Sequence, residues 1–466
     1  MSVIVYEINE VPRRLFDFYA DAFPGSAFAQ LRIYSNLFET LTADVGELSP
    51  WITWPTMHRG VSNVHHEISD LGQSLTKVNS EFPSIYSILA QSGVKVGVFG
   101  SLQSYPPPKN LDNYCFYVPD TFAAGDECFP DQLSDFQSFN LSMVRFNGRN
   151  VSSSIAVKSA SRFLTKSIKL GLKPTTFMKL SNKILKDRLV RRRTSQAEIA
   201  FDLYFQQLKN SQPDISFFFT NHVASSMHRY WPTVFPRDYE EGKFDVNWLK
   251  QWAGEIPHAV KVANFQLQMI IDYCQQTNSE LIVCSSMGQG AVKNTEPVER
   301  QVLITNVRKL MSYIGLTNED WEPNLAMSPQ IVITPKSQSC IAALEYLNHI
   351  RINGSTIKVS HTASDEVRID ISLNNQNSIE IKDGNKIIEP HEIGIENINL
   401  QDGASAYAYH IPEGIMIHYN PANLSQSNND RKWKTISALD FAPSILSKFA
   451  LEVPSYMQNE NIFGSN

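Results

Sequence analysis

The stretch PDISFFFTN, residues 213–221, decides the fold class of this 466-residue chain. Its apolar side chains fall on both faces of the predicted strand, and the run closes with the polar Thr220 and Asn221. The helix-like AEIAFDLYFQQLKN directly precedes it, at residues 197–210. Strands that are apolar on both faces are typical of a parallel sheet buried between two layers of helices.

Three more apolar runs repeat this pattern elsewhere in the chain. They are VIVYEIN at 3–9, VKVGVFG at 94–100 and ELIVCSS at 280–286, with helical spacing at 82–92 and 259–275. This alternation predicts an α/β fold, a three-layer α/β/α sandwich with a mainly parallel central sheet. Ligands of such sheets bind at the carboxyl ends of the strands, so we expect the functional residues in the tails that follow these runs.

The composition excludes several classes of protein. With 42% hydrophobic, 11% aromatic and 19% charged residues, the chain is neither disordered nor collagen-like. The formal net charge of -6 disfavours a globally basic nucleic-acid binder. The first residues lack a secretory pattern, and no apolar run approaches the roughly 18 residues of a membrane-spanning helix. Because the five cysteines form no CxxC motif, we expect reduced thiols and a cytoplasmic location.

Two segments differ from the predicted core, which we assign to 1–149, 201–317 and 401–466. Residues 150–200 predict a basic helical insertion, because Lys158 to Arg193 hold twelve Lys/Arg and one acidic residue. This insertion is either a solvated helical face or a surface for a phosphorylated substrate, a nucleotide-sugar or an anionic membrane. Residues 318–400 alternate apolar and polar side chains between turn signals, which predicts a small α+β insertion.

Several motifs occur in the order used by the alkaline phosphatase superfamily, especially its type I phosphodiesterase/nucleotide pyrophosphatase and sulfatase-like branches. VYEINE resembles the first strand of that family, and LSPWITWPTMHRGVSNVHH resembles the nucleophile helix with the His-Gly that follows it. FFFTNHVASSMHRYW resembles the Asp-to-His segment, and LIVCSSMGQ resembles the Ser-Asp-His-Gly strand. YHIPEGI and LDFAPSIL resemble the last metal motif and the terminal helix.

The resemblance implies an alkaline phosphatase-like fold and a hydrolase or phosphotransferase that acts on a phosphate or sulfate ester. The metal-binding pattern is incomplete, because Glu7 or Asn9 stands for the first Asp and Ala224 for the second. Ser286 and Met287 stand for the Asp-His pair, and both are poor ligands for a hard divalent ion. The resemblance therefore implies a divergent member that has lost the two-metal site or rebuilt it.

The nucleophile has two candidates. Counting back from Gly60 selects Ser49, whereas the pattern Thr-aromatic-Pro selects Thr53. Ser49 is equally suited to cap a helix that begins at Pro50. A chain without a covalent nucleophile also stays open.

The remaining site residues are assigned by chemistry and by the resemblance. His228 and His410 are expected to hold one divalent cation (zinc, manganese or magnesium) or to transfer protons, with Glu7 and Asn9 as further metal candidates. Five residues are expected to contact a small anionic or glycan-linked substrate: Asn221, His222, Arg229, Trp231 and Ser286. Arg229 suits an anion and Trp231 suits a sugar or a base. Two alternatives remain, a non-catalytic relative that binds a phosphorylated glycan or a partner, and a metal-independent transferase.

Overall fold

The computed structural model describes residues 2–145, 189–324, 326, 330–361, 366–423, 432–457 and 461–463. The chain divides into two compact units: unit 1 is Met1–Asp70, Ser74–Thr295 and Ala406–Asn466, and unit 2 is Leu71–Gln73 and Glu296–Ser405. The segment predicted as an α+β insertion, 318–400, lies within unit 2. Most of the predicted basic insertion, residues 150–188, lies outside the described residues.

Unit 1 is built on an eight-stranded sheet in the order β20-β2-β19-β6-β1-β5-β3-β4. Its strands are β1 (Val3–Ile8), β2 (Ser35–Leu41), β3 (Val96–Phe99), β4 (Tyr114–Val118), β5 (Ile215–Thr220), β6 (Glu280–Ser285), β19 (Glu413–Tyr419) and β20 (Lys434–Ser437). Every neighbouring pair is parallel except the two pairs that include β19. The predicted mainly parallel sheet is confirmed.

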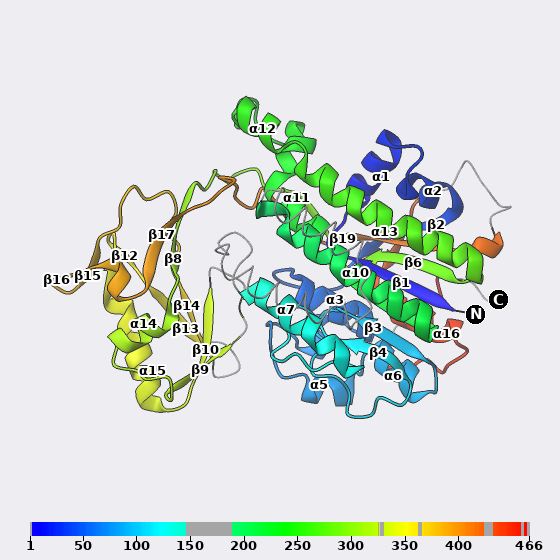
Figure 1. The fold of residues 1–466 in the computed structure, drawn as a ribbon, viewed down its shortest axis with the longest axis horizontal. Coiled ribbons are helices and arrows are strands. Elements are labelled where there is room, and N and C mark those ends of the chain that lie inside the picture. Colours follow the sequence, from blue (N-terminus) through cyan, green and yellow to red (C-terminus); the bar gives the residue numbers. More distant parts are fainter. Residues whose placement is uncertain are drawn as a thin grey trace. The chain divides into compact units, whose positions relative to one another are not determined.

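One face of the sheet is covered by α10 (Arg192–Ser211) and α13 (Glu255–Thr277), which run across it in Figure 1. Tyr6 of β1 reaches this face, where its hydroxyl donates to Gln266 of α13. Tyr204 of α10 stacks on Phe218 of β5, with ring centroids 4.7 Å apart. The even-numbered residues of β1 therefore point to these two helices.

The opposite face is covered by α3 (Pro50–Arg59), α6 (Ile85–Gln91) and α16 (Phe441–Lys448). Val3 and Val5 of β1 pack here in one cluster with Trp54, Leu89 and Ile445. Burial on both faces explains the unbroken apolar runs in the sequence, and the two helix layers confirm the predicted three-layer sandwich.

The site-bearing elements begin where the parallel strands end. α11 (His222–Val234) follows β5 directly, and β7 (Gly288–Ala291) follows β6 and pairs with β18 (Ala408–Ile411). The start of α3 is set by Pro50 at its first turn, and its end is set by Gly60, whose φ of 65° favours glycine. The other α-helices in the described part of unit 1 are α1 (Arg13–Ala22), α2 (Ala27–Tyr34), α4 (Asn63–His66), α5 (Thr76–Glu81), α7 (Ser134–Arg145) and α12 (Val246–Trp252).

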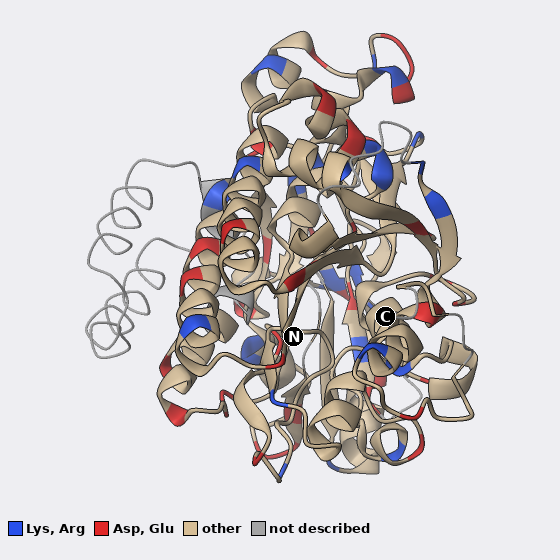
Figure 2. Cartoon of the chain, turned by 90° about the vertical axis from the view of Figure 1, so that its right-hand side faces the viewer, with Lys and Arg blue, Asp and Glu red and all other residues tan. Residues whose placement is uncertain are grey.

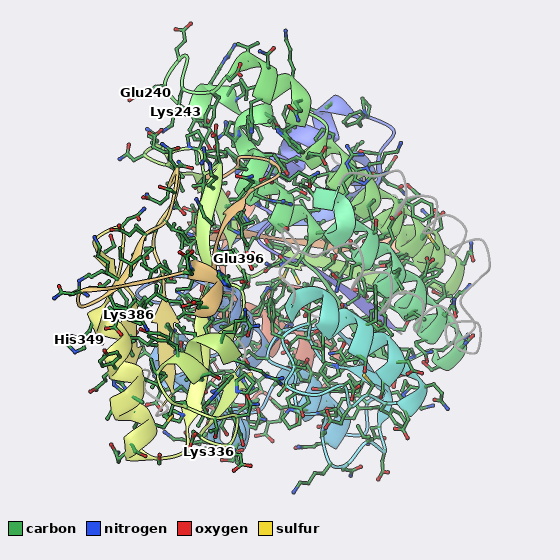
Figure 3. All side chains as sticks on the ribbon, turned by 60° about the vertical axis from the view of Figure 1, so that its left-hand side comes forward. Glu240, Lys243, Lys336, His349, Lys386 and Glu396 are labelled. Carbon is green, nitrogen blue, oxygen red and sulfur yellow. The ribbon has the colours of Figure 1, made fainter. Side chains whose placement is uncertain are left out.

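Unit 2 has its own apolar core, which includes Ile333, Leu344, Ile369 and Ile395. Among the described residues of this unit, two antiparallel four-stranded sheets, one two-stranded sheet and the α-helices α14 (Val307–Tyr313) and α15 (Gln338–Glu345) surround it. The strands are β8 (Arg300–Ile304), β9 (Trp321–Asn324), β10 (Ile331–Pro335), β11 (Ile350–Ile352), β12 (Ser355–Thr356), β13 (Lys358–His361), β14 (Val367–Asp370), β15 (Ile381–Asp383), β16 (Lys386–Ile388) and β17 (Ile395–Asn399). Figure 3 shows exposed polar side chains on this unit, among them Lys336, His349 and Lys386.

Basic and acidic residues are interspersed over the described elements in Figure 2, and neither sign gathers on one face in that view. Within the described part of the chain, no helix combines the length and the apolar character needed to cross a bilayer.

Candidate metal centre

Three side chains from distant parts of unit 1 converge on one point. Nε2 of His228, on α11, lies 3.0 Å from Oε2 of Glu10, and Nε2 of His410, on β18, lies 3.5 Å from the same oxygen. One ligand atom from each of the three residues lies within 4.8 Å of the others. In the described part of the chain, no other group of three His, Cys, Asp or Glu residues has this arrangement.

The orientation of both imidazoles is fixed by backbone carbonyl oxygens. Nδ1 of His228 lies 2.7 Å from the Ala408 oxygen, and Nδ1 of His410 lies 2.6 Å from the Leu48 oxygen. Because a carbonyl oxygen only accepts, each Nδ1 carries a hydrogen and donates it. Each Nε2 of the neutral rings therefore presents its lone pair to Glu10, as in histidines that bind metals through Nε2.

A lone pair that faces a carboxylate oxygen at this distance needs a positive charge between the two atoms. A proton on Nε2 or a divalent cation can supply this charge. Two imidazole nitrogens and a carboxylate oxygen suit zinc, manganese and related ions. The three residues therefore fit a single divalent cation.

The electrostatics agree with this interpretation. Burial raises the pKa of Glu10, but attraction to His228 and hydrogen bonds from both imidazoles outweigh it and hold that pKa well below its usual range. Burial lowers the pKa of His410, but the hydrogen bond and charge of Glu10 outweigh it and raise that pKa. The carboxylate thus stays ionised inside the protein, ready to bind a positive charge.

Glu10 owes its position to a sharp turn after β1. Its φ is 57°, in the left-handed region, and Val11 and Pro12 follow. Along a regular strand, Glu10 would point to the opposite face from Asn9, but the turn redirects it. Nδ2 of Asn9 donates to Oε1 of Glu10 over 2.7 Å, and Nε2 of Gln289 donates to Oε2. Glu10 is not among the site residues predicted from the sequence, although it is the next carboxylate after Glu7 at the end of β1.

The structure does not bring Glu7 to the two histidines. Glu7 is fully buried, and its Oε1 lies 2.7 Å from Nε2 of His58 on α3. Its Oε2 accepts from the Ser101 hydroxyl over 2.8 Å. Both carboxylate oxygens are therefore used within the layer between β1 and α3, because Glu7 points to the α3 face.

Asn9 lies beside the centre, with its oxygen turned away from it. Nε1 of Trp54 donates to Oδ1 of Asn9 over 2.8 Å, and Nδ2 of Asn9 donates to Oδ1 of Asn221 over 2.8 Å. The side of Asn9 that faces Glu10 is thus the amide nitrogen, which cannot ligate a cation. Asn9 positions Glu10 and Asn221 instead.

The two candidate nucleophiles have different surroundings. Thr53 is fully buried, and its hydroxyl lies 2.7 Å from the hydroxyl of Ser286, which is also fully buried. Ser49 is the N-cap residue of α3, but its side chain makes no capping hydrogen bond. Its buried hydroxyl has no partner among the described residues. Ser49 directly follows Leu48, whose carbonyl oxygen orients His410.

Three residues expected to contact substrate are instead engaged within the protein. His222 is buried, with Nδ1 2.7 Å from the Thr220 hydroxyl and Nε2 3.1 Å from the Ala259 oxygen. Nε of Arg229 donates to the Ser225 oxygen over 3.2 Å. Trp231 is 1% exposed, and its Nε1 donates to Asp238 over 2.8 Å, so its ring offers no open face to a sugar or a base.

Ser286 and Met287, which stand where the resemblance places an Asp-His pair, are not accessible to a ligand from solvent. Both have 0% exposure, and neither belongs to the Glu10, His228 and His410 group. The residues that the structure describes therefore support one cation at this edge of the sheet.

No protein-family model and no curated protein sequence matches the chain. Among solved structures, it is similar to murine ectonucleotide pyrophosphatase/phosphodiesterase 5, with 13% identity, a TM-score of 0.39 and coverage of 99% of this chain and 98% of that chain. It is also similar to phosphonoacetate hydrolase from Sinorhizobium meliloti 1021, with 12% identity, a TM-score of 0.41 and coverage of 95% and 94%. A TAB5 alkaline phosphatase mutant with magnesium bound gives 9% identity, a TM-score of 0.37 and coverage of 97% and 98%.

Because these identities and TM-scores are low, we base the function on the residues of this chain. The three structures are of alkaline phosphatase superfamily proteins, the family that the order of motifs in this sequence resembles.

Proposed function

We propose that the chain is a hydrolase or phosphotransferase of phosphate or sulfate esters that uses one divalent cation. Glu10, His228 and His410 would hold the cation. The observation that carries this proposal is the pair of imidazoles whose Nε2 lone pairs converge on one buried carboxylate oxygen. A cation at this point, bound to an ester oxygen, would neutralise the charge that develops during transfer.

Two hydroxyl groups of the chain are candidates for the nucleophile that attacks the ester. The Ser49 hydroxyl is our first candidate nucleophile, because it is buried without a partner at the start of α3. Thr53 is the second candidate, one helical turn later. Attack by either hydroxyl oxygen on phosphorus would form a phosphoester and release the alcohol, and water would then regenerate the hydroxyl. Leu48, the residue before Ser49, accepts a hydrogen bond from Nδ1 of His410 through its carbonyl oxygen.

The test begins with elemental analysis of the full chain, purified without chelator. We expect about one zinc, manganese or magnesium ion per chain, lost in His228→Ala and His410→Ala. His361→Ala is the matched control, because His361 is an exposed histidine of unit 2. Bis(p-nitrophenyl) phosphate, p-nitrophenyl phosphate and p-nitrophenyl sulfate are then offered with and without the metal. Absence of metal and of turnover in the wild type would reject the proposal.

One observation favours a second candidate, a non-catalytic protein that binds an anion at the cation. Ser286 and Met287, which stand where the resemblance places an Asp-His pair, are both buried and are poor ligands for a second cation. A wild-type protein that binds metal and inorganic phosphate but turns over none of the three esters would support this candidate.

A further inference from the structure

We infer that Asn221 donates an amide hydrogen bond to an anionic oxygen of the substrate, in an orientation that Trp54 sets through Asn9. The inference deepens the proposed function and rests on it for the substrate class, a tetrahedral oxyanion such as a phosphate or sulfate group. It concerns a binding residue and does not depend on which hydroxyl is the nucleophile.

The first step is the orientation of the Asn9 side chain. The Trp54 indole has one polar atom, and it can only donate. Its Nε1 lies 2.8 Å from Asn9, and Trp54 is completely buried. The oxygen of Asn9 must therefore face Trp54, and its amide nitrogen must face the other way. The partner on that side agrees, because Oε1 of the ionised Glu10 can only accept.

The second step passes this orientation to Asn221. Both hydrogens of the Asn9 amide are used, one on Glu10 and the other on Asn221 over 2.8 Å. The atom of Asn221 that faces Asn9 must therefore be its oxygen. Its Nδ2 carries two hydrogens, and no hydrogen bond of Nδ2 is found within the described residues. Asn221 is only partly buried, so this donor group reaches solvent.

The third step is the location of this donor. Asn221 is the N-cap of α11, a 13-residue helix, and its side chain makes no capping hydrogen bond. The first N–H groups of such a helix and its dipole favour a negative group at the same end. Asn221 is also joined through Asn9 to Oε1 of Glu10, whose other oxygen faces both histidines. The donor therefore lies next to the candidate metal centre.

These features together select an anion as the ligand. A cation at the centre attracts a negatively charged oxygen, and an amide N–H group accepts no competing proton or cation. A donor aligned before the substrate arrives costs little reorganisation when charge develops on the oxygen. The chain of hydrogen bonds from Trp54 to Asn9 to Asn221 supplies that alignment.

The decisive variant is Asn221→Asp, which keeps the oxygen that accepts from Asn9 but replaces the donor by a second acceptor. Inorganic phosphate is titrated calorimetrically into the full chain loaded with zinc, and bound zinc is measured on the same samples. We expect Asn221→Asp to bind phosphate at least about tenfold more weakly at equal zinc content, the usual size for a lost hydrogen bond to a charged group. Asn264→Asp is the matched control, because Asn264 also accepts through Oδ1, from the Ala27 amide, and the charge change is the same.

A second variant tests the relay itself. Trp54→Phe removes the indole donor, so that Asn9 and then Asn221 are free to rotate their amides. We expect phosphate affinity to fall about threefold to tenfold with zinc content unchanged. Wild-type phosphate affinity in Asn221→Asp, or no phosphate binding by the wild type, would overturn the inference. Phosphate binding that is lost in Asn221→Asp, in a protein that hydrolyses no ester, would support the inference and reject catalysis.

Discussion

Nε2 of His58 lies 2.7 Å from Oε1 of Glu7, and neither side chain is more than 1% exposed. A second polar link joins α3 to the turn directly after β1, between Trp54 and Asn9. The two links are one turn apart on α3 and two residues apart along the chain at the end of β1. They fix the rotation and the register of α3, which begins at Pro50, relative to the strand that leads to Glu10.

The first prediction concerns the stability that depends on this link. Glu7→Leu leaves His58 and the Ser101 hydroxyl without their buried partner, so we expect the free energy of unfolding to fall by about 3–5 kcal/mol. Urea unfolding measures it. Glu322→Gln is the control, because the Lys336–Glu322 pair is exposed (44% and 66%) and its loss should cost less than about 1 kcal/mol. Equal losses of unfolding free energy in the two variants would show that the buried Glu7–His58 pair stabilises the fold no more than an exposed pair does.

The second prediction concerns the carboxylate of the metal centre. Glu10→Gln keeps the size of the side chain but removes its charge, so zinc affinity should fall at least about tenfold. Competition with a chromophoric chelator measures this affinity. Glu241→Gln removes an exposed carboxylate of unit 1 that belongs to another loop, and zinc affinity should not change. If Glu10→Gln binds zinc like the wild type, the cation is held elsewhere.

The third prediction separates the two hydroxyls. Ser49→Ala should abolish turnover of whichever ester is hydrolysed while zinc stays bound. Thr53→Val should mainly lower stability, by about 1–3 kcal/mol, because it leaves the buried Ser286 hydroxyl without its partner. Acid-quenched intact-mass measurements would show a phosphorylated chain that is absent in Ser49→Ala. The reverse pattern would assign the covalent step to Thr53, and turnover in both variants would exclude a covalent step through either.

The fourth prediction concerns the dependence of stability on pH. Burial lowers the pKa of His222 from 6.5 to about 4. The folded state therefore favours the neutral ring, and its contribution is complete above pH 6.5 and is lost as the pH falls toward 4. This single group should account for up to about 3 kcal/mol between these limits.

Urea unfolding at a series of pH values checks the His222 contribution. Between pH 4 and pH 6.5, the slope of the free energy of unfolding against pH should be smaller in His222→Gln. The difference should correspond to about one proton fewer taken up on unfolding. His361→Gln, at an exposed histidine, should leave the slope unchanged. An unchanged slope in His222→Gln would mean that the proton uptake on unfolding comes from other groups.

The sequence predicted the fold well because its signals are local. Apolar runs such as 213–221 became central strands, and the tails after those strands hold His228 and other residues of the site. The convergence of His228 and His410 was expected from the resemblance. It depends on the pairing of β18 with β7, which no local pattern reveals.

The rest of the site depends on geometry that a sequence pattern does not contain. Glu7 and Asn9 were predicted as metal candidates at the end of a regular strand, whereas the left-handed turn at Glu10 redirects the side chain of that residue to the two histidines. Arg229 and Trp231 lie close to His228 in sequence, but successive helical residues point in different directions, so both turn into the protein. Spacing alone could not show which of these neighbours faces the centre.

The three candidate metal ligands stand at positions 10, 228 and 410, so the candidate centre spans almost the whole length of the chain. A ribosome must release the C-terminal strands before the last histidine can meet the other two ligands. Contacts with such large sequence separation form late, because the loops that they close are long. Cation binding at this point would therefore report complete folding of unit 1, and a chain truncated before His410 would lack one ligand of the centre.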